Sequence, residues 1–286
     1  IIYSNQKLLY DALYHAASAT LNELAKDAKY LGANIGYICI LHTWGSAMNY
    51  HPHIHTIVLG GGLDDENKWK ETGGKFFLPY GVISKVFRGK YLDELKSLWN
   101  DSKLKFHGTA EKYQNSYRFK ELLDKCYEKN WVTYCKETFN GAQSVINYLG
   151  KYTHRIAISN HRIKSMTDTT VTYVVKDYKN EGCWKEKTIS GEEFIRRFMM
   201  HVPPKRFVRI RHYGLLSCRN KRKKITHCRN LLGCKKYIST LKNLNAVEMI
   251  RVLYHIDVCK CSSCGGNMVS PRKDKYSSSF RAHMRC

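Results

Sequence analysis

The stretch IGYICILHTWGSAMNYHPHIHTIVL, residues 35–59, decides the fold that we expect for this chain. Residues 35–43 and 53–59 are rich in β-branched and aromatic side chains, a composition typical of strands. The polar segment at 44–50 separates them, and strands so close in sequence pair most simply as an antiparallel hairpin. Apolar residues at helical spacing over residues 3–31 predict an amphipathic helix before the hairpin. The combination indicates an α+β fold.

The rest of the chain continues this mixture of helices and strands. Further helices are predicted at 84–100, 117–136, 142–152, 191–200 and 229–256. Further strands are predicted at 155–159, 170–178, 184–189 and 206–213. The elements divide into a main domain at 1–216, a basic helical segment at 217–258 and a Cys-rich tail at 259–286. No apolar run approaches the roughly 20 residues of a membrane span, so we expect none.

The charge of the chain indicates the class of its partner. Among 286 residues, 48 are Lys or Arg and 24 are Asp or Glu, which gives a formal net charge of +24. Such an excess is typical of proteins that bind a polyanion, and 20 Tyr with 5 Trp supply the stacking faces that binders of single-stranded nucleic acid need. Nucleic acid is therefore the favoured partner. The alternative is a basic surface that only aids solubility.

The segment HPHIH at 51–55 is the sharpest local feature of the sequence. Because side chains alternate along a strand, His53 and His55 project on the same side, and two imidazoles on one face can share a divalent cation. If the turn is centred on 44–51, residues whose numbers sum to about 95 face each other, which places His42 opposite His53. The sequence therefore predicts a three-histidine metal site. The alternative is a set of surface histidines beside a turn.

The segment NYLGKY, inside the helix predicted at 142–152, carries two tyrosines. Tyr148 and Tyr152 are four residues apart, so they share one face of that helix. Tyrosine is a poor nucleophile at its ordinary pKa of about 10, but a metal, or a cation such as Lys151 or Arg155, could make its attack on a phosphodiester possible. The alternative is a pair of aromatic rings in the core, and the histidines give the catalytic interpretation its weight.

Basic residues gather in the last third of the chain. In the strand predicted at 206–213 they alternate with apolar residues, and the charge run RNKRKK follows at 219–224. A basic face of this kind would track a phosphate backbone, and the alternative is a solvated charge run. The candidate DNA-binding residues are Arg206, Arg209, Arg211, Arg219, Lys221, Arg222, Lys223 and Lys224.

The tail carries a CxxCGG knuckle, a common half of a zinc ribbon. Cys261 and Cys264 form the knuckle, and a zinc site needs two further ligands. We predict a structural Zn²⁺ with Cys259 and Cys286 as the second pair. The alternatives are free thiols, an incomplete site, or ligands drawn from His283, Cys218, Cys228 and Cys234.

Four blocks of the sequence resemble, in the same order, the two-tyrosine transposases of rolling-circle insertion sequences. LHTWGSAMNYHPHIHTIVLGGGL at 41–63 resembles their HUH motif region. NYLGKYTHRIAISNHRI at 147–163 resembles their tyrosine helix and the strand after it. EEFIRRFMMHVPPKRFVRIRHYGLL at 192–216 and CSSCGGNM at 261–268 are similar to their next shared block and their C-terminal Cys motif.

The resemblance implies a fold and a mechanism. The fold is an HUH-endonuclease-like antiparallel sheet flanked by helices, with His53 and His55 binding Mg²⁺ or Mn²⁺. Tyr148 or Tyr152 attacks single-stranded DNA at transposon ends and target site, giving a 5′-phosphotyrosine and a free 3′-OH. The second tyrosine permits strand transfer, in an order that the sequence does not give. The protein is then expected in the bacterial cytoplasm, associated with the nucleoid when bound to DNA.

Two rival interpretations remain beside the transposase. A plasmid relaxase or rolling-circle replication initiator shares the histidine and tyrosine chemistry, whereas a zinc-containing DNA-binding protein would use these residues only structurally. The resemblance also shows one departure. The family usually carries an N-terminal Cys-rich zinc domain, whereas this chain opens at the nuclease helix with IIYSNQ and no starting Met. We expect either a fragment or a shorter protein that depends on a partner to recognise the element's ends.

Overall fold

The computed structural model describes residues 1–73, 78–136, 139, 141–153, 156–177, 182–234, 241, 243–261 and 263–268. The chain forms two compact units, Ile1–Ile225 and Thr226–Cys286. No helix among the described residues is long and apolar enough to cross a membrane. The first unit combines helices with antiparallel sheets, so the α+β prediction is confirmed at this level.

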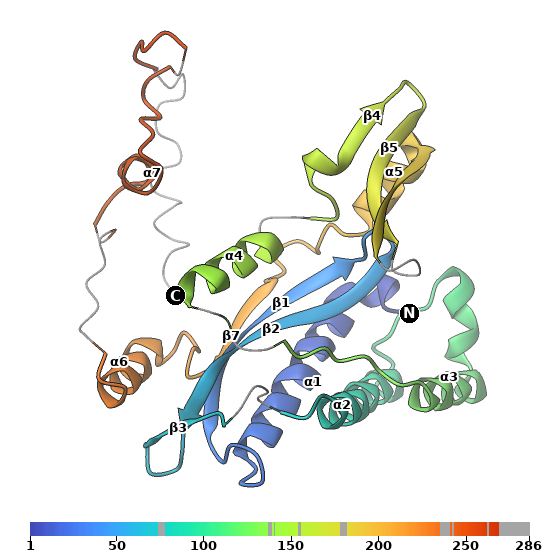
Figure 1. Cartoon of the computed structure of the whole chain (residues 1–286). Helices are drawn as coiled ribbons and strands as arrows, with labels where there is room; N and C mark the ends of the chain where they lie inside the picture. The colour runs from blue at the N-terminus through green and yellow to red at the C-terminus, as the bar shows by residue number, and fades with distance from the viewer. Residues whose placement is uncertain are drawn as a thin grey trace. The chain divides into compact units, whose positions relative to one another are not determined.

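A four-stranded antiparallel sheet forms the centre of the first unit (Figure 1). Its order is β3-β2-β1-β7, with β1 at Asn34–Trp44, β2 at Tyr50–Leu63, β3 at Trp69–Glu71 and β7 at Ile210–Gly214. The predicted hairpin of β1 and β2 is confirmed. From the pair Tyr37 and Val58 to the pair His42 and His53, the residue numbers of all partners sum to 95. His42 therefore lies opposite His53, as the spacing of the turn predicted.

Helices cover both faces of this sheet (Figure 1). α1 (Gln6–Lys26), preceded by a short 3-10 turn, shares one core with the odd-numbered residues of β1, such as Tyr37 and Leu41; its buried leucines are Leu9, Leu13, Leu21 and Leu24. Because successive side chains of a strand point to opposite faces, His42 points away from α1. The opposite face is covered by α4 (Ala142–Thr153), which carries the tyrosines. The alternation of one strand therefore separates the core from the candidate site.

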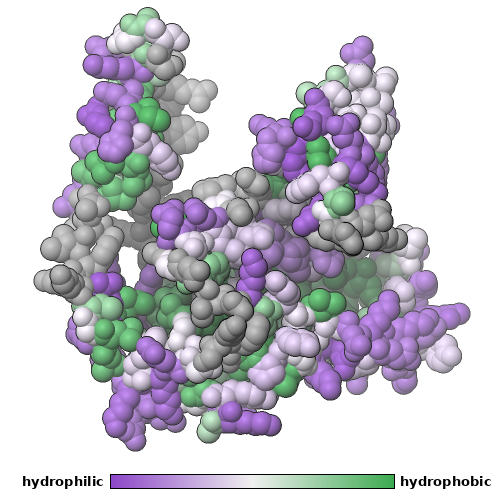
Figure 2. Space-filling model, in the orientation of Figure 1, coloured by the Kyte–Doolittle hydropathy of each residue, from purple (hydrophilic) through white to green (hydrophobic). Residues whose placement is uncertain are grey.

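Two further helices lie beside α1. α2 (Tyr80–Asn100) packs along it, and α3 (Ser116–Glu128) follows a 3-10 turn at Gly108–Gln114. The outer surface of α3 is hydrophilic (Figure 2).

The helix predicted at 117–136 ends earlier in the structure, at Glu128. The backbone turns extended at Lys129, and Trp131 packs its ring onto Phe87 and Tyr91 of α2.

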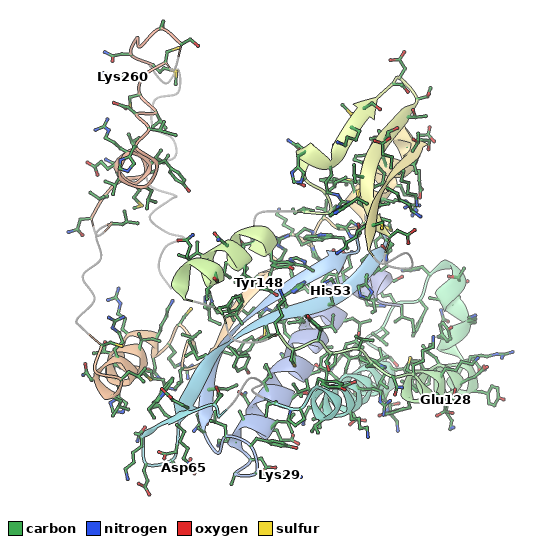
Figure 3. The ribbon with its side chains drawn as sticks, in the orientation of Figure 1. Lys29, His53, Asp65, Glu128, Tyr148 and Lys260 are labelled. Carbon is green, nitrogen blue, oxygen red and sulfur yellow. The ribbon has the colours of Figure 1, made fainter. Side chains whose placement is uncertain are left out.

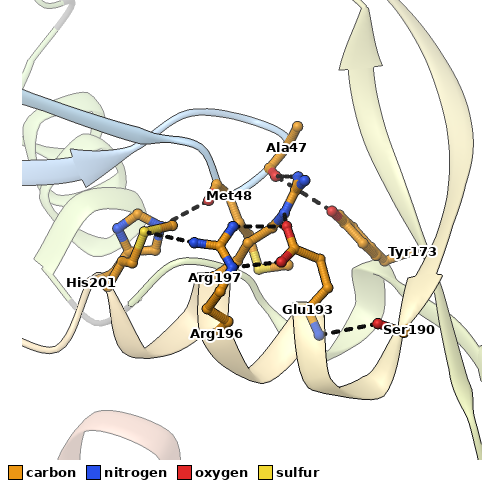
Figure 4. A network of polar contacts seen from close by, with 9 residues as sticks. Ala47, Met48, Tyr173, Ser190, Glu193, Arg196, Arg197 and His201 are labelled. Carbon is orange, nitrogen blue, oxygen red and sulfur yellow. Dashed lines mark hydrogen bonds and ion pairs between the residues drawn. The ribbon is translucent and has the colours of Figure 1, made fainter. Parts of the chain in front are cut away.

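A second sheet in the same unit holds the turn of the hairpin. It has the order β4-β5-β6, with β4 at Ile163–Met166, β5 at Thr170–Asp177 and β6 at Cys183–Ser190, and α5 (Gly191–Met199) follows it. Figure 4 shows the contacts: Arg197 donates to the carbonyl of Ala47 at 3.0 Å, and Tyr173 donates to the same oxygen at 3.4 Å. Glu193 binds Arg197 at 2.7 Å and so orients it. The turn between β1 and β2 is thereby fixed from outside the hairpin.

His201 completes this clamp and allows a test of it. The side chain is 2% exposed, its Nε2 donates to the carbonyl of Met48 at 3.1 Å, and its Nδ1 lies 3.1 Å from the hydroxyl of Thr43. We expect His201→Phe to lower the free energy of unfolding by roughly 1–3 kcal/mol, because two buried polar groups lose their partner. Urea denaturation measures this, with exposed His107→Phe as the control; equal losses in both variants would contradict the clamp.

Two predicted strands differ from the structure. The residues at 156–159 do not form the strand predicted at 155–159, because Ala157 takes a positive φ of 58° that interrupts an extended backbone. The strand predicted at 206–213 begins only at Ile210, since Arg206 has a φ of 61°. The structure instead adds the short strand β4, which the sequence did not predict.

The single helix predicted at 229–256 is also wrong. The structure has two helices, α6 (Lys221–Leu231) and α7 (Ala246–Tyr254). Gly233, with a φ of 63°, follows the end of α6, and residues 221–224 of the charge run form its first turn. Asn245 begins α7 through a capping box with Glu248. Local start and stop signals therefore outweighed the apolar periodicity of this segment.

Candidate functional site

Three histidines meet on the face of the central sheet that α4 covers. One ring nitrogen from each of His42, His53 and His55 lies within 4.8 Å of those of the other two. The Nε2 atoms of His53 and His55 are 3.1 Å apart. Ile54, between them, packs into the core on the opposite side, so the predicted alternation is confirmed. In the part of the chain that the structure describes, this is the one group of three or more His, Cys, Asp or Glu that could hold a metal ion.

Backbone carbonyls fix which nitrogen carries the proton in two of these rings. His53 Nδ1 lies 2.7 Å from the carbonyl oxygen of His51, and His42 Nε2 lies 2.9 Å from that of Tyr152. A carbonyl can only accept, so both nitrogens are N–H donors. The lone pairs therefore lie on His53 Nε2 and His42 Nδ1. Metal-ligating histidines usually donate their second nitrogen to a carbonyl or carboxylate, as these two do.

Burial keeps the three imidazoles neutral. Desolvation lowers the pKa of His42 to about 4 and the pKa of His55 to about 3, and it also lowers the pKa of His53. The other histidines of the group add to the shift in each of His42 and His55 through repulsion between positive charges. Neutral imidazole is the form that binds metals. The donor set fits a divalent cation, and nitrogen ligands suit Mn²⁺ better than Mg²⁺, which prefers oxygen.

α4 places both tyrosines over the histidines. The rings of Tyr148 and Tyr152 are 4.5 Å apart between centroids, as four-residue spacing on a helix predicted. The Tyr148 hydroxyl lies 3.0 Å from Nδ1 of His55, and Figure 3 shows this side chain reaching from α4 toward the strand of His53. Burial raises the pKa of Tyr148 to about 12. The phenol is therefore protonated at neutral pH unless a donor or a positive charge stabilises its anion.

Three residues of the site escaped the sequence analysis. Trp44 stacks on His42 with centroids 4.4 Å apart and an angle of 20° between rings. Phe139 packs edge-on against Tyr148 at 5.3 Å. His201 holds the turn next to them. Only Trp44 carried a signal, because it lies two residues after His42 on the same face of the strand.

Comparison with known proteins places the chain in a family. A family model described as "Putative transposase", named Y2_Tnp, matches residues 36–224. The chain belongs to this transposase family. The matched range includes the histidines, the tyrosine helix and the basic start of α6. The predicted resemblance to transposases is therefore confirmed.

Two curated relatives of this transposase-family chain carry similar names. "Putative transposase y4qJ" of Sinorhizobium fredii is 40% identical over 234 residues, which are 82% of this chain and 59% of that protein. The transposase for insertion sequence element IS801 of Pseudomonas savastanoi pv. phaseolicola is 27% identical over 271 residues, 94% of this chain and 63% of that protein. The chain thus spans about three fifths of the length of these relatives. No solved structure matches it.

In this transposase-family chain, the predicted DNA-binding residues differ in their contacts and exposure. Arg209 donates from Nη2 to the carbonyl of Thr153, 2.9 Å away at the end of α4. Arg211 forms an ion pair with Asp11 on α1. The remaining cations lie on exposed or half-exposed positions, namely Arg206, Arg219, Lys221, Arg222, Lys223 and Lys224. Arg155 and the side chain of Lys151 lie outside the described residues.

The Cys-rich tail has the local shape of a knuckle. The backbone N–H of Gly265 donates to the carbonyl of Cys261 at 2.9 Å, and that of Met268 donates to the carbonyl of Cys259 at 2.7 Å. Hydrogen bonds from Cys264 and Ser263 lower the pKa of the Cys261 thiol, which favours the thiolate that binds zinc. The predicted ligand Cys286 lies outside the described residues, so the zinc site stays a prediction.

Proposed function

We propose that this chain is the nuclease core of a rolling-circle transposase, a metal-dependent single-stranded DNA endonuclease and strand transferase with tyrosine nucleophiles. The observation that carries the proposal is the 3.0 Å contact between the Tyr148 hydroxyl and His55, a member of the histidine group. The family match and the relative named for insertion sequence IS801 support the same function. The site would act in the cytoplasm, on DNA of the nucleoid.

The chemistry follows from what each residue offers. A divalent cation bound to the histidines supplies polarisation of the scissile phosphate. The tyrosine oxygen attacks phosphorus, the bond from phosphorus to the 3′ oxygen breaks, and that oxygen takes a proton. The 5′-phosphate stays on the tyrosine, so the bond energy is kept and a later 3′-OH can displace the tyrosine without ATP. Two tyrosines 4.5 Å apart between ring centroids allow two strands to be handled at one site.

The other parts of the chain have supporting roles in this proposal. The exposed basic start of α6, within the segment 217–258, contacts DNA phosphates, so the affinity for DNA falls as the salt concentration rises. The tail at 259–286 binds a structural Zn²⁺ through its knuckle. The same site chemistry would serve a plasmid relaxase or replication initiator, and the family match favours the transposase.

Covalent capture tests the proposed function. We expect labelled single-stranded DNA carrying element ends to form an adduct that survives denaturing electrophoresis with Mn²⁺ and is absent with EDTA. The double variant Tyr148→Phe/Tyr152→Phe should lose the adduct by more than roughly 1,000-fold, because no nucleophile remains. Exposed Tyr117→Phe on α3 is the matched control. Tight DNA binding without any adduct on verified ends would instead indicate a non-catalytic DNA-binding protein.

A further inference from the structure

The two tyrosines of α4 are held in different ways. The Tyr148 hydroxyl meets the edge of His55 at 3.0 Å from Nδ1, with 68° between the rings. Tyr152 instead lies over the face of His55, with centroids 4.2 Å apart and 33° between the rings. The backbone carbonyl of Tyr152 accepts the hydrogen bond from His42 Nε2. Within the described parts of the chain, the Tyr152 hydroxyl has no hydrogen-bond partner. Only one of the two phenol oxygens is therefore tied to the histidine group.

His55 has a choice of tautomer that its neighbours do not have. Its Nε2 lies 3.1 Å from His53 Nε2, which carries a lone pair, and its Nδ1 faces the Tyr148 hydroxyl. With no cation between the rings, the proton on His55 Nε2 bridges to His53, and Nδ1 accepts from Tyr148. If His53 and His55 were to hold a divalent cation through Nε2, the proton of neutral His55 would sit on Nδ1. The hydrogen bond then reverses, and His55 donates to the Tyr148 oxygen.

We propose that this reversal selects Tyr148 as the nucleophile of the first cleavage, with His55 as its positioning residue; the inference rests on the proposed function. The reversed bond stabilises negative charge on the Tyr148 oxygen and turns the phenolic proton toward water. The Tyr148 oxygen then bonds to phosphorus, the 3′ oxygen leaves with a proton from water, and the phenolic proton is released to water. Among the residues that the structure describes, Tyr152 has no such donor, and we assign it to the second strand.

Mapping the adduct tests the order of the tyrosines. We expect mass spectrometry of the proteolysed Mn²⁺-dependent adduct to find the nucleotide on Tyr148 at early times. First cleavage should fall more than roughly 100-fold further in Tyr148→Phe than in Tyr152→Phe, because only the first removes the attacking oxygen. Tyr117→Phe again serves as the matched control. An early adduct on Tyr152, or equal losses in the two variants, would overturn the inference while leaving the proposed function in place.

A second measurement needs no DNA and no turnover. With tyrosine labelled by ¹³C at the hydroxyl-bearing ring carbon, Mg²⁺ should shift the Tyr148 signal more than the Tyr152 signal, because only the Tyr148 hydrogen bond reverses. The two Tyr→Phe variants assign the signals, and Tyr117 gives the unaffected reference. Equal shifts would overturn the role of His55. Failure of the wild-type protein to form any adduct on verified ends would overturn both this inference and the proposed function.

Discussion

Replacement of His55 by Ala is expected to abolish Mn²⁺ binding and to lower the rate of phosphotyrosine formation by at least roughly 1,000-fold. This side chain has two contacts that the proposed reaction would use. Its Nε2 lies 3.1 Å from that of His53 in the histidine group, and its Nδ1 lies 3.0 Å from the Tyr148 hydroxyl. Loss of His55 would therefore remove a proposed metal ligand and the contact of the proposed nucleophile together. Titration calorimetry with Mn²⁺ and single-turnover capture measure the two effects separately.

His51→Ala is the matched control for this variant. His51 lies on the same strand and its side chain is exposed; its backbone carbonyl contacts His53 Nδ1, its ring lies 5.0 Å from the His53 ring between centroids, and it is not a member of the histidine group. Alanine keeps that carbonyl, so His53 keeps its tautomer, and we expect Mn²⁺ affinity within about threefold of wild type. Unchanged Mn²⁺ affinity in His55→Ala would show that the histidines do not form the metal centre.

The sequence predicted the hairpin well because two local rules determine it. A short turn sets which residues face each other, and the alternation of a strand sets which side they occupy. These two rules bring His42, His53 and His55 to one face of the sheet. Contacts between distant segments followed no such rule. The hydrogen bond from His42 to Tyr152 joins residues 110 positions apart, and no spacing in the sequence announced it.

For the basic residues, the sequence pattern was a poor guide to their arrangement. Alternation at 206–213 suggested one basic face, but Arg206 and Arg209 precede β7 and only Arg211 lies within it. Arg209 then contacts the end of α4, and Arg211 pairs with Asp11 on α1. Charge patterning reports the sign of a surface, whereas tertiary contacts decide which cations stay available for DNA.

The metal-free protein is expected to lose stability as the pH falls from about 6.5 toward 4. The pKa of His42 is lowered to about 4 and that of His55 to about 3 by burial, against 6.5 in an unfolded chain. Between these values the unfolded chain binds protons that the folded protein does not. The neutral histidines therefore contribute fully to stability above pH 6.5. Below that pH the free energy of unfolding falls, with a limiting slope of about 1.4 kcal/mol per pH unit for each histidine.

Urea denaturation in EDTA at several pH values between 7 and 4.5 measures this slope. His42→Asn should flatten it, because asparagine does not titrate, whereas His107→Asn at an exposed position should leave it unchanged. Mn²⁺ should raise the stability at pH 7 and lose this effect in acid, since protons compete with the cation for the same imidazoles. A wild-type slope that His42→Asn does not reduce, or stabilisation by Mn²⁺ that persists at pH 4.5, would contradict a site built from neutral buried histidines.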